Sequence, residues 1–229
     1  MKKIFYLILA ISFFTACRKE SVNTQNEVSE NGNIIDNIQR PEAVSRVTIG
    51  TQVWMTKNLS VSKYRNGDTI PKVTNATQWK NLTTGAWCYY ANKSVNGTIA
   101  GKLYNWYAVN DTRGLAPLGW HIPSNTEWNT LATYLGGETI AGGKMKSTTM
   151  WDAPNFGATN SSGFTALAGG YRHQYGPYYY WGSYCYWWSA DQVAGTSTAF
   201  YYTLFSGSED IQYDGENKGK GFSVRCIKN

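Results

Sequence analysis

The fold is decided by the stretch Gly119-Trp120-His121-Ile122-Pro123-Ser124-Asn125-Thr126-Glu127-Trp128, which carries the clearest helix start in the chain. Within it, Ser124 and Glu127 have the S-x-x-E spacing of a capping box, in which each residue satisfies a free backbone amide of the other. Pro123 stands just ahead of the box and stiffens the approach to the helix. A helix is therefore predicted to begin at this point.

The residues that follow this helix start repeat at helical spacing. Apolar side chains recur three and four residues apart and predict one buried face; they are Trp128, Leu131, Ala132 and Leu135. Gly136 can adopt the positive φ angle that commonly closes a helix. We expect the apolar face to pack on a small, aromatic-rich antiparallel sheet formed mainly by the last third of the chain.

The last third of the chain changes to a period of two, which is typical of strands. Tyr184, Tyr186 and Trp188 are predicted to face one side of a strand, and Cys185 and Trp187 the other. Further strands are expected in Phe164–Arg172, Phe200–Phe205 and Phe222–Ile227. Asp214-Gly215 is a hairpin signal, although Gly219 and Gly221 offer an alternative turn.

The region before the capped helix contains shorter elements. We expect two strand pieces in Val47–Met55 around a Gly-Thr turn and a buried strand in Ala86–Tyr90. A short helix is predicted over Ala100–Val109, and Ala141–Ser147 would add one further helical turn. The predicted fold is α+β, with two helices packed on a twisted antiparallel sheet and long irregular loops between them.

The N-terminus reads as an export signal. Lys2-Lys3 precede an apolar run that is too short to span a bilayer, and Phe14-Thr15-Ala16-Cys17 resembles the lipobox of bacterial lipoproteins. We expect residues 1–16 to be a lipoprotein signal peptide and Cys17 to carry the lipid, in preference to a buried N-terminal helix. This predicts a protein anchored to the bacterial outer membrane, on its periplasmic face or at the cell surface.

Residues 17–46 are predicted to form a flexible stalk after the lipidated cysteine. The segment is rich in Asn, Glu, Ser and Gln and has too little apolar surface to offset its ordering entropy. The alternative is a poorly marked structured segment. The folded domain is expected over residues 47–229.

The charged residues argue against a nucleic-acid partner. The chain has 21 Lys and Arg against 15 Asp and Glu, and the basic residues are scattered without forming a stripe. We expect no nucleic-acid binding, and we expect a monomer.

Three cysteines remain if Cys17 is lipidated, namely Cys88, Cys185 and Cys226. An odd number allows at most one disulfide, and the spacing does not decide which two would pair. No C-x-x-C pair is present, so neither a thioredoxin-like site nor a zinc knuckle is indicated.

Several motifs in this order resemble one family. They are Cys88-Tyr89-Tyr90, Leu103-Tyr104-Asn105-Trp106-Tyr107, Gly119–Ser124 with Glu127-Trp128, Leu135-Gly136-Gly137, Gly169–Arg172, Trp187-Trp188-Ser189 and Gly221–Cys226. Together they resemble the Fibrobacter succinogenes major paralogous domain, common in lipoproteins of Bacteroidetes. One departure is Ala116, where the family often has Cys. The resemblance implies a C-type-lectin-like fold; it implies no reaction, because no activity is established for the family.

The sequence contains no recognisable catalytic triad or zinc-binding motif. His121 and His173 are the only histidines, and they have no placed carboxylate with which to form a triad or a zinc site. We expect His121 to be a structural hydrogen-bonding residue and His173 an exposed loop residue. No cofactor is expected, although Asp210, Asp214 and Glu216 are weak calcium candidates.

The third functional hypothesis is an oxidase related to the formylglycine-generating enzymes. Those enzymes use two cysteines close together in the sequence, whereas Cys185 and Cys226 are far apart here. We therefore expect the protein not to be an enzyme.

An aromatic run near the C-terminus is the candidate binding surface. Tyrosine gives rigid contact area at low entropic cost, as in antibody paratopes. The tentative ligand-binding residues are Tyr175, Tyr178, Tyr179, Tyr180, Trp181, Tyr184, Tyr186 and Tyr201, and the expected structural residues are Ser124, Glu127, Trp120, Trp188 and Arg225. The hypothesis is a recognition or adhesion module for an extracellular glycan or protein. The alternatives are cross-strand aromatic pairs that only stabilise the sheet, and a structural envelope lipoprotein without a soluble ligand.

Overall fold

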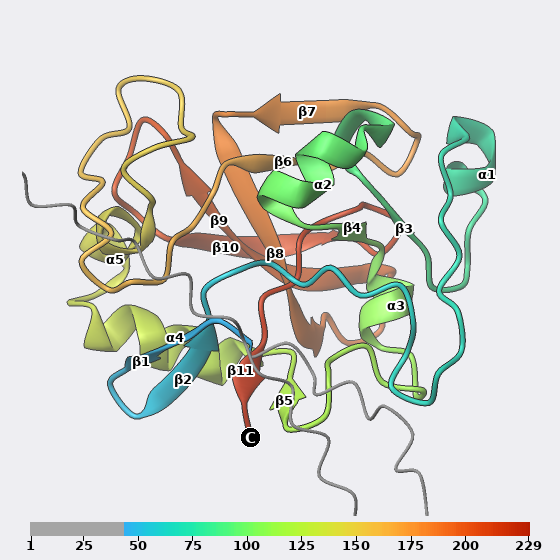
Figure 1. Cartoon of the computed structure of the whole chain (residues 1–229), viewed down its shortest axis with the longest axis horizontal. Helices are drawn as coiled ribbons and strands as arrows, with labels where there is room; N and C mark the ends of the chain where they lie inside the picture. The colour runs from blue at the N-terminus through green and yellow to red at the C-terminus, as the bar shows by residue number, and fades with distance from the viewer. Residues whose placement is uncertain (1–43) are drawn as a thin grey trace, which may run out of the picture. The chain divides into compact units, whose positions relative to one another are not determined.

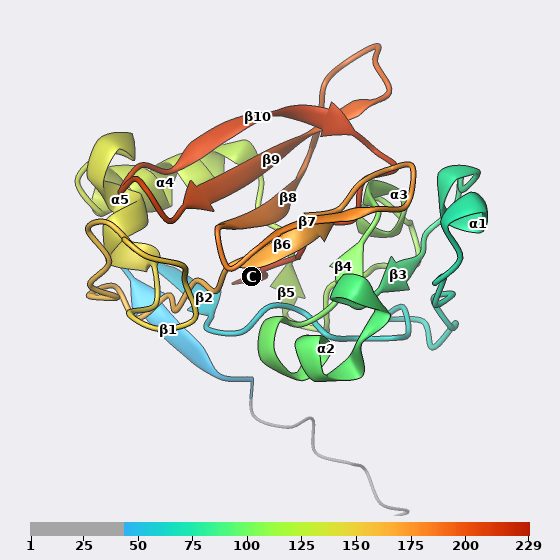
Figure 2. The same ribbon diagram turned by 90° about the horizontal axis from the view of Figure 1, so that it is seen from above.

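The computed structural model describes residues 44–229 (Figure 1). Its helices are α1 (Ala76–Lys80), α2 (Ser94–Ala100), α3 (Trp106–Val109), α4 (Asn125–Tyr134) and α5 (Glu138–Met145), with the 3-10 helix η1 (Tyr90–Asn92). In two perpendicular views, α4 and α5 lie on the opposite side of the domain from α1 and α3 (Figures 1 and 2). The mixture of helices and sheets confirms the α+β class, with more helices than the two that were predicted.

A five-stranded sheet forms the centre of the domain, in the order β10-β9-β8-β6-β7. Its strands are β6 (Gly169–Arg172), β7 (Tyr178–Trp181), β8 (Tyr184–Gln192), β9 (Thr198–Phe205) and β10 (Gln212–Asn217). All neighbours are antiparallel except β6 and β8, which are parallel where Gly170 lies beside Cys185. The sheet is therefore mixed and not purely antiparallel as expected.

Two smaller sheets complete the fold. One has the order β1-β2-β11-β5, and the other is the pair β3-β4. Their strands are β1 (Arg46–Ile49), β2 (Gln52–Met55), β3 (Trp87–Cys88), β4 (Leu103–Tyr104), β5 (Trp120–His121) and β11 (Ile227–Lys228). Ile227 pairs with both Trp54 and His121, so the last strand joins the first hairpin to the stretch that precedes α4.

Helix α4 has the predicted start and end. The Ser124 hydroxyl accepts a hydrogen bond from the Glu127 amide at 3.3 Å, and the Glu127 carboxylate accepts one from the Ser124 amide at 2.8 Å. At the other end, the Gly137 amide donates to the Ala132 carbonyl at 2.9 Å, which is the long bond of a Schellman motif. The capping box read from the sequence is thus confirmed.

The buried face of α4 packs on the central sheet. The Trp128 ring lies 4.9 Å from Tyr202 and 5.8 Å from Trp187, measured between ring centroids. Trp54 of β2 also packs on Trp128, with ring centroids 4.9 Å apart. These aromatic contacts join the helix, the first hairpin and the central sheet into one core.

Buried cations brace this core without carboxylates. Arg225 is 1% exposed and donates hydrogen bonds to the Met55 and Phe164 carbonyls and to the Asn58 side chain. A buried charge must be fully hydrogen-bonded to be tolerated. Arg225 is therefore placed as the structural residue that was expected.

The three cysteines of the folded part are all buried and unpaired. Cys226, Cys185 and Cys88 belong to three separate hydrophobic clusters. Burial raises the pKa of the Cys226 thiol to about 12 and raises those of the other two. The disulfide that the sequence allowed does not form among residues 44–229.

Several predictions of local structure are wrong; of the strand expected over Phe222–Ile227, for example, only Ile227 lies in a strand, β11. The helix expected over Ala100–Val109 is divided into α2, β4 and α3, because Gly101 ends α2 at φ 78° and Asn105 caps a new helix at Trp106. Asp214-Gly215 does not form a hairpin turn: β10 makes its hairpin with β9, which precedes it, and a separate turn lies at Lys218-Gly219, near the alternative position. Asp214 and Gly215 are within β10, where they pair with Tyr201 and Phe200.

The predicted signal peptide, the lipidation site Cys17 and nearly all of the stalk lie outside the described residues. Within residues 44–229, no helix has both the length and the apolar character needed to cross a bilayer.

Candidate functional site

The two faces of the central sheet differ in what covers them. Along β8, Cys185 and Trp187 face the cluster beneath α4, whereas Tyr184, Tyr186 and Trp188 face the opposite cluster. This alternation was predicted from the sequence. At the Trp188 end the second face is covered, since the Trp188 indole donates to the Tyr104 carbonyl and its ring lies 4.3 Å from Phe222.

The Tyr184 end of the same face carries a continuous run of aromatic rings. Successive centroids are 4.5 to 6.1 Å apart, which is contact distance for aromatic pairs. We call this run the aromatic strip; in order it consists of Tyr175, His173, Tyr179, Tyr171, Tyr180, Tyr184 and Phe205. The strip crosses four strands of the sheet and the β6–β7 turn.

The aromatic strip is accessible to a ligand. Tyr175 is 59% exposed, Tyr180 51% and Tyr179 42%, and Tyr184 is half-buried. Such accessible, contiguous rings are unusual on a soluble surface and commonly mark a binding region. Rings of the predicted site are therefore available at this surface and are not sealed in the interior.

Tyr186 and Tyr201 support the strip from one side. Tyr186 is 9% exposed and stacks on the buried Phe222 at 5.0 Å. Tyr201 lies 5.7 Å from Tyr186, and burial together with the nearby Asp214 raises the pKa of Tyr201 to about 12. Both phenols stay protonated at neutral pH and can donate hydrogen bonds.

A charged pair borders the strip. Lys220 forms an ion pair with Glu216, and the Lys220 ammonium lies 5.1 Å from the centroid of the Tyr171 ring. The charge of Glu216, after burial, also contributes to the raised pKa of the Tyr171 and Tyr201 phenols. The border thus places a partly exposed carboxylate, paired with a largely buried ammonium group, next to the strip.

Tyr180 has an unusual backbone. Its φ angle is +64°, in the left-handed region that residues with side chains rarely adopt. In this conformation its ring lies 4.9 Å from Tyr184 and 5.9 Å from Tyr171. Strain of this kind is often kept where a side chain must be held in place for function.

Two residues of the predicted site belong to the other face. The Tyr178 hydroxyl donates to the Asn92 side chain at 2.7 Å, and its ring packs on Tyr90. Trp181 also packs on Tyr90, with centroids 4.9 Å apart. The structure therefore does not bring Tyr178 and Trp181 together with the strip.

Other residues of the site were not among the ligand-binding residues predicted from the sequence. Tyr171 is central to the strip, and Phe205 ends it, stacked on Tyr184 at 4.5 Å. Tyr171 lies in the Gly169–Arg172 motif, and Phe205 in a predicted strand of alternating aromatics, so both had a local signal. Lys220 had none, because its place depends on the pairing of Gly221 with Arg172 across the sheet.

The three calcium candidates are not grouped into a metal site. Among residues 44–229 no three His, Cys, Asp or Glu side chains are grouped to hold a metal ion. Asp210 and Asp214 line a surface hollow of about 410 Å³ beside β10, together with Glu138 and Tyr201. Glu216 is taken by Lys220.

His121 is held in a hydrogen-bonded position. Its Nε2 lies 2.7 Å from the Glu127 carboxylate and its Nδ1 lies 2.8 Å from the Asn229 side chain. Glu127 thereby completes both the capping box and this contact. The geometry agrees with the structural role predicted for His121, whereas His173 lies within the strip between Tyr175 and Tyr179.

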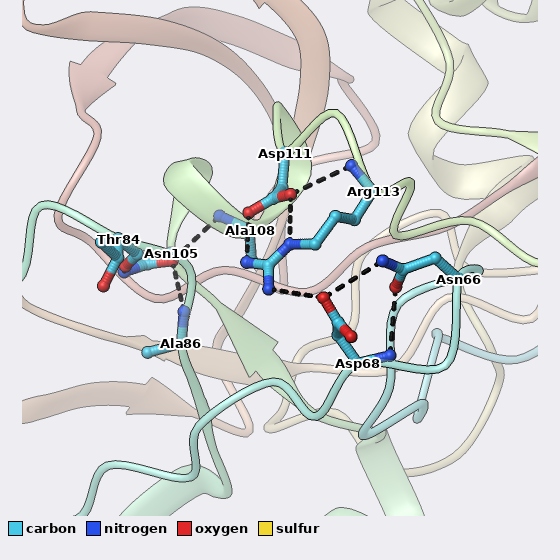
Figure 3. A network of polar contacts seen from close by, with 8 residues as sticks. All are labelled: Asn66, Asp68, Thr84, Ala86, Asn105, Ala108, Asp111 and Arg113. Carbon is cyan, nitrogen blue, oxygen red and sulfur yellow. Dashed lines mark hydrogen bonds and ion pairs between the residues drawn. The ribbon is translucent and has the colours of Figure 1, made fainter.

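A separate polar network surrounds α3 and includes Arg113 and Asn105 (Figure 3). Arg113 bridges Asp111 and Asp68, and hydrogen bonds from Arg113 lower the pKa of Asp111 to about 2. The buried Asn105 side chain accepts from the Ala86 and Ala108 amides. The network joins two loops and the start of α3.

These features define a class of protein: an α+β domain with one helix-covered sheet face and one partly open aromatic face. The chain belongs to the Fibrobacter succinogenes major domain family, whose model matches residues 47–228. Comparisons with curated proteins and with solved structures gave no match.

Proposed function

We propose that this domain is a non-catalytic recognition module that binds an extracellular glycan on the aromatic strip. The observation that carries the proposal is the unbroken contact of accessible rings from Tyr175 to Phe205. The apolar faces of sugar rings stack on such surfaces, while their hydroxyls need charged or polar partners at the edge. The partly exposed Glu216, held by the largely buried Lys220, supplies such a partner at the edge of the strip.

We further propose that the module is a lipoprotein of the bacterial outer membrane, anchored through Cys17 with residues 17–46 as a stalk. Lipid chains on a single cysteine suffice for stable anchoring without a membrane-spanning helix. The C-type-lectin-like fold implied by the family resemblance remains part of this proposal. It is supported by the pairing of β2 with β11, which joins the two ends of the domain.

The strand β7 supplies a matched test, because Tyr178 lies away from the strip to which Tyr179 and Tyr180 belong. We would measure binding of Tyr179→Ala, Tyr180→Ala and Tyr178→Ala to a panel of soluble polysaccharides by affinity electrophoresis, alongside thermal melting. The open-face variants should weaken binding at least tenfold with little change in melting. Tyr178→Ala should lower the melting temperature and leave binding intact while the protein is folded.

A structural envelope lipoprotein without a soluble ligand is the second candidate. It is favoured by the contacts between strip residues of neighbouring strands, such as Tyr171 with Tyr186 at 5.0 Å, which also stabilise a sheet. In that case Tyr179→Ala and Tyr180→Ala would lower stability, and no polysaccharide would bind the unmodified protein.

An oxidase of the formylglycine-generating type is not favoured. Its chemistry needs reactive thiolates, whereas Cys185 and Cys226 are buried in separate clusters and their thiol pKa values are raised.

A further inference from the structure

A hollow beside α3 is separate from the aromatic strip and shares no residue with it. Its volume is about 300 Å³, and it is lined by the loop of Thr83 and Thr84 on one side and by Tyr107 and the residues after α3 on the other. Binding pockets for small molecules begin at about this size. The hollow is therefore large enough for one small ligand.

Both walls of this hollow are held in place by hydrogen bonds within the protein (Figure 3). The buried Asn105 side chain donates to the Thr84 carbonyl at 2.8 Å and accepts from the Ala108 amide at 3.1 Å, which ties the Thr84 loop to α3. On the opposite wall, Arg113 donates to both carboxylate oxygens of Asp111, at 2.8 Å each. Walls that are rigid before a ligand arrives lower the entropic cost of binding it.

The polar side chains that line the hollow are not used by the fold. Within residues 44–229, the hydroxyls of Thr83 and Thr84 and the side-chain amide of Asn110 make no hydrogen bond to the protein. The hydroxyl of the half-buried Tyr107 is likewise free there. Such groups are hydrated, and ligand hydroxyls can replace their water at small net cost. The hollow thus gathers free donors and acceptors beside an aromatic side chain.

A buried donor lies at the back of the same hollow. Tyr64 is 2% exposed, and its hydroxyl has no hydrogen-bond partner among the described residues. The hydroxyl lies against Gly85, where a Cβ atom would overlap it. Burial, followed by the charge of Asp111, raises the pKa of Tyr64 to about 12, so the phenol keeps its proton. An unsatisfied buried hydroxyl is costly and calls for a partner outside the protein, and Gly85 and Asp111 both line the hollow.

The charges around the hollow disfavour an anion. Arg113 is shared by Asp111 and Asp68, which leaves the three groups with a net negative charge. Hydrogen bonds from Arg113 lower the pKa of Asp111 to about 2, so its carboxylate is ionised and accepts strong hydrogen bonds from hydroxyl groups.

This combination of groups matches a sugar. A sugar ring has hydroxyls for the threonines, Asn110 and Asp111, and an apolar face for Tyr107. We propose that the hollow binds one neutral sugar unit, either as a free monosaccharide or as the end of a glycan chain. This site is independent of the one proposed on the aromatic strip.

The test titrates the full chain with glucose, galactose, mannose and N-acetylglucosamine, and with the disaccharides maltose, lactose and chitobiose. Binding is followed by the shifts of backbone amide signals in NMR spectra. Thr84→Val removes one hydroxyl at constant shape, and Asn110→Ala removes the free amide. Thr133→Val is the matched control, because this exposed threonine of α4 does not line the hollow.

We expect at least one sugar to shift the amides of residues 83–85 and 110–113, and Thr84→Val and Asn110→Ala to weaken its binding at least tenfold with unchanged melting. A disaccharide that shifts these amides when its monosaccharide does not would identify the ligand as a chain end. Tyr179→Ala, which tests the strip, should leave this binding intact. If no probe shifts these amides, or if Thr84→Val binds as well as Thr133→Val does, the proposal is wrong, whatever the strip binds.

Discussion

The Trp128 ring stacks on the Tyr202 ring with centroids 4.9 Å apart and planes inclined by 20°. Trp128 belongs to α4 and Tyr202 to β9, so this pair holds the helix on the helix-covered face of the central sheet. Both side chains are almost fully buried. The aromatic strip lies on the opposite face of the sheet, which α4 does not cover.

Replacing Trp128 by Ala should lower the free energy of unfolding by about 3–5 kcal/mol, because it leaves a large cavity between α4 and the sheet. Urea unfolding followed by circular dichroism measures the change. Thr133→Ala, an exposed position on the same helix, should stay within about 0.5 kcal/mol of the unmodified protein. Equal stability of the two variants would contradict the packing described here.

The capping box should make a smaller contribution. Ser124→Ala removes the hydroxyl that accepts from the Glu127 amide, and loss of such a cap costs about 1 kcal/mol. Ser124→Thr keeps a hydroxyl at this position and should recover most of the loss. If the Thr variant unfolds as easily as the Ala variant, the hydroxyl does not act as a cap.

The Asp111–Arg113 pair predicts a pH dependence. The folded-state pKa of Asp111 is about 2, below the value of about 3.9 for an unfolded chain. Its contribution to stability is therefore fully present above pH ~4 and is lost as the pH falls from about 4 to about 2.

The comparison with Asp111→Asn isolates this contribution, because the variant cannot titrate at this position. The difference in unfolding free energy between the two proteins should be constant near neutral pH and shrink below pH ~4. A difference that stays the same down to pH ~2 would show that the pair does not stabilise the fold.

Tyr180 should show opposite effects on stability and on binding. Its positive φ costs of order 1–2 kcal/mol for a residue with a side chain. Tyr180→Gly removes that strain along with the ring contacts, so stability should hold or rise while polysaccharide binding falls. Tyr179 has no such strain, so Tyr179→Gly should lose binding and also about 1 kcal/mol of stability, because glycine adds backbone freedom within a strand. A large destabilisation by Tyr180→Gly would count against a strained, functionally retained ring.

The thiols of Cys88, Cys185 and Cys226 should be unreactive in the native protein. Burial raises the pKa of each thiol, and the thiolate is the reactive form. A thiol reagent at pH 8 should therefore label these three positions only after unfolding in denaturant. Detection by mass spectrometry of any disulfide between them would contradict the structure.

The elements that were predicted correctly depend on short-range patterns. The cap at Ser124, the first hairpin at Gly50-Thr51 and the alternation of Tyr184 to Trp188 each need only residues close together in the sequence. The helix expected over Ala100–Val109 failed because Leu103 and Trp106 happen to have helical spacing. In the structure Tyr104 pairs with Trp87 and with Phe222, which local periodicity does not reveal.

The candidate site was predicted only in part. The run of tyrosines pointed to the correct region, but within β7 only Tyr179 and Tyr180 face the strip, so Tyr178 and Trp181, which pack on Tyr90, were assigned to the wrong surface.

The sequence by itself determined the α+β class, the family, the capped helix and the two-sided pattern of β8, since caps and periodicities act between near neighbours. Only the tertiary structure decided which sheet face stays open, and it did so by laying Tyr104 and Phe222 over the Trp188 end and leaving the Tyr184 end accessible. The physical reason is that exposure is a property of the packed whole. A tyrosine in a strand has the same local pattern whether or not a distant segment covers it.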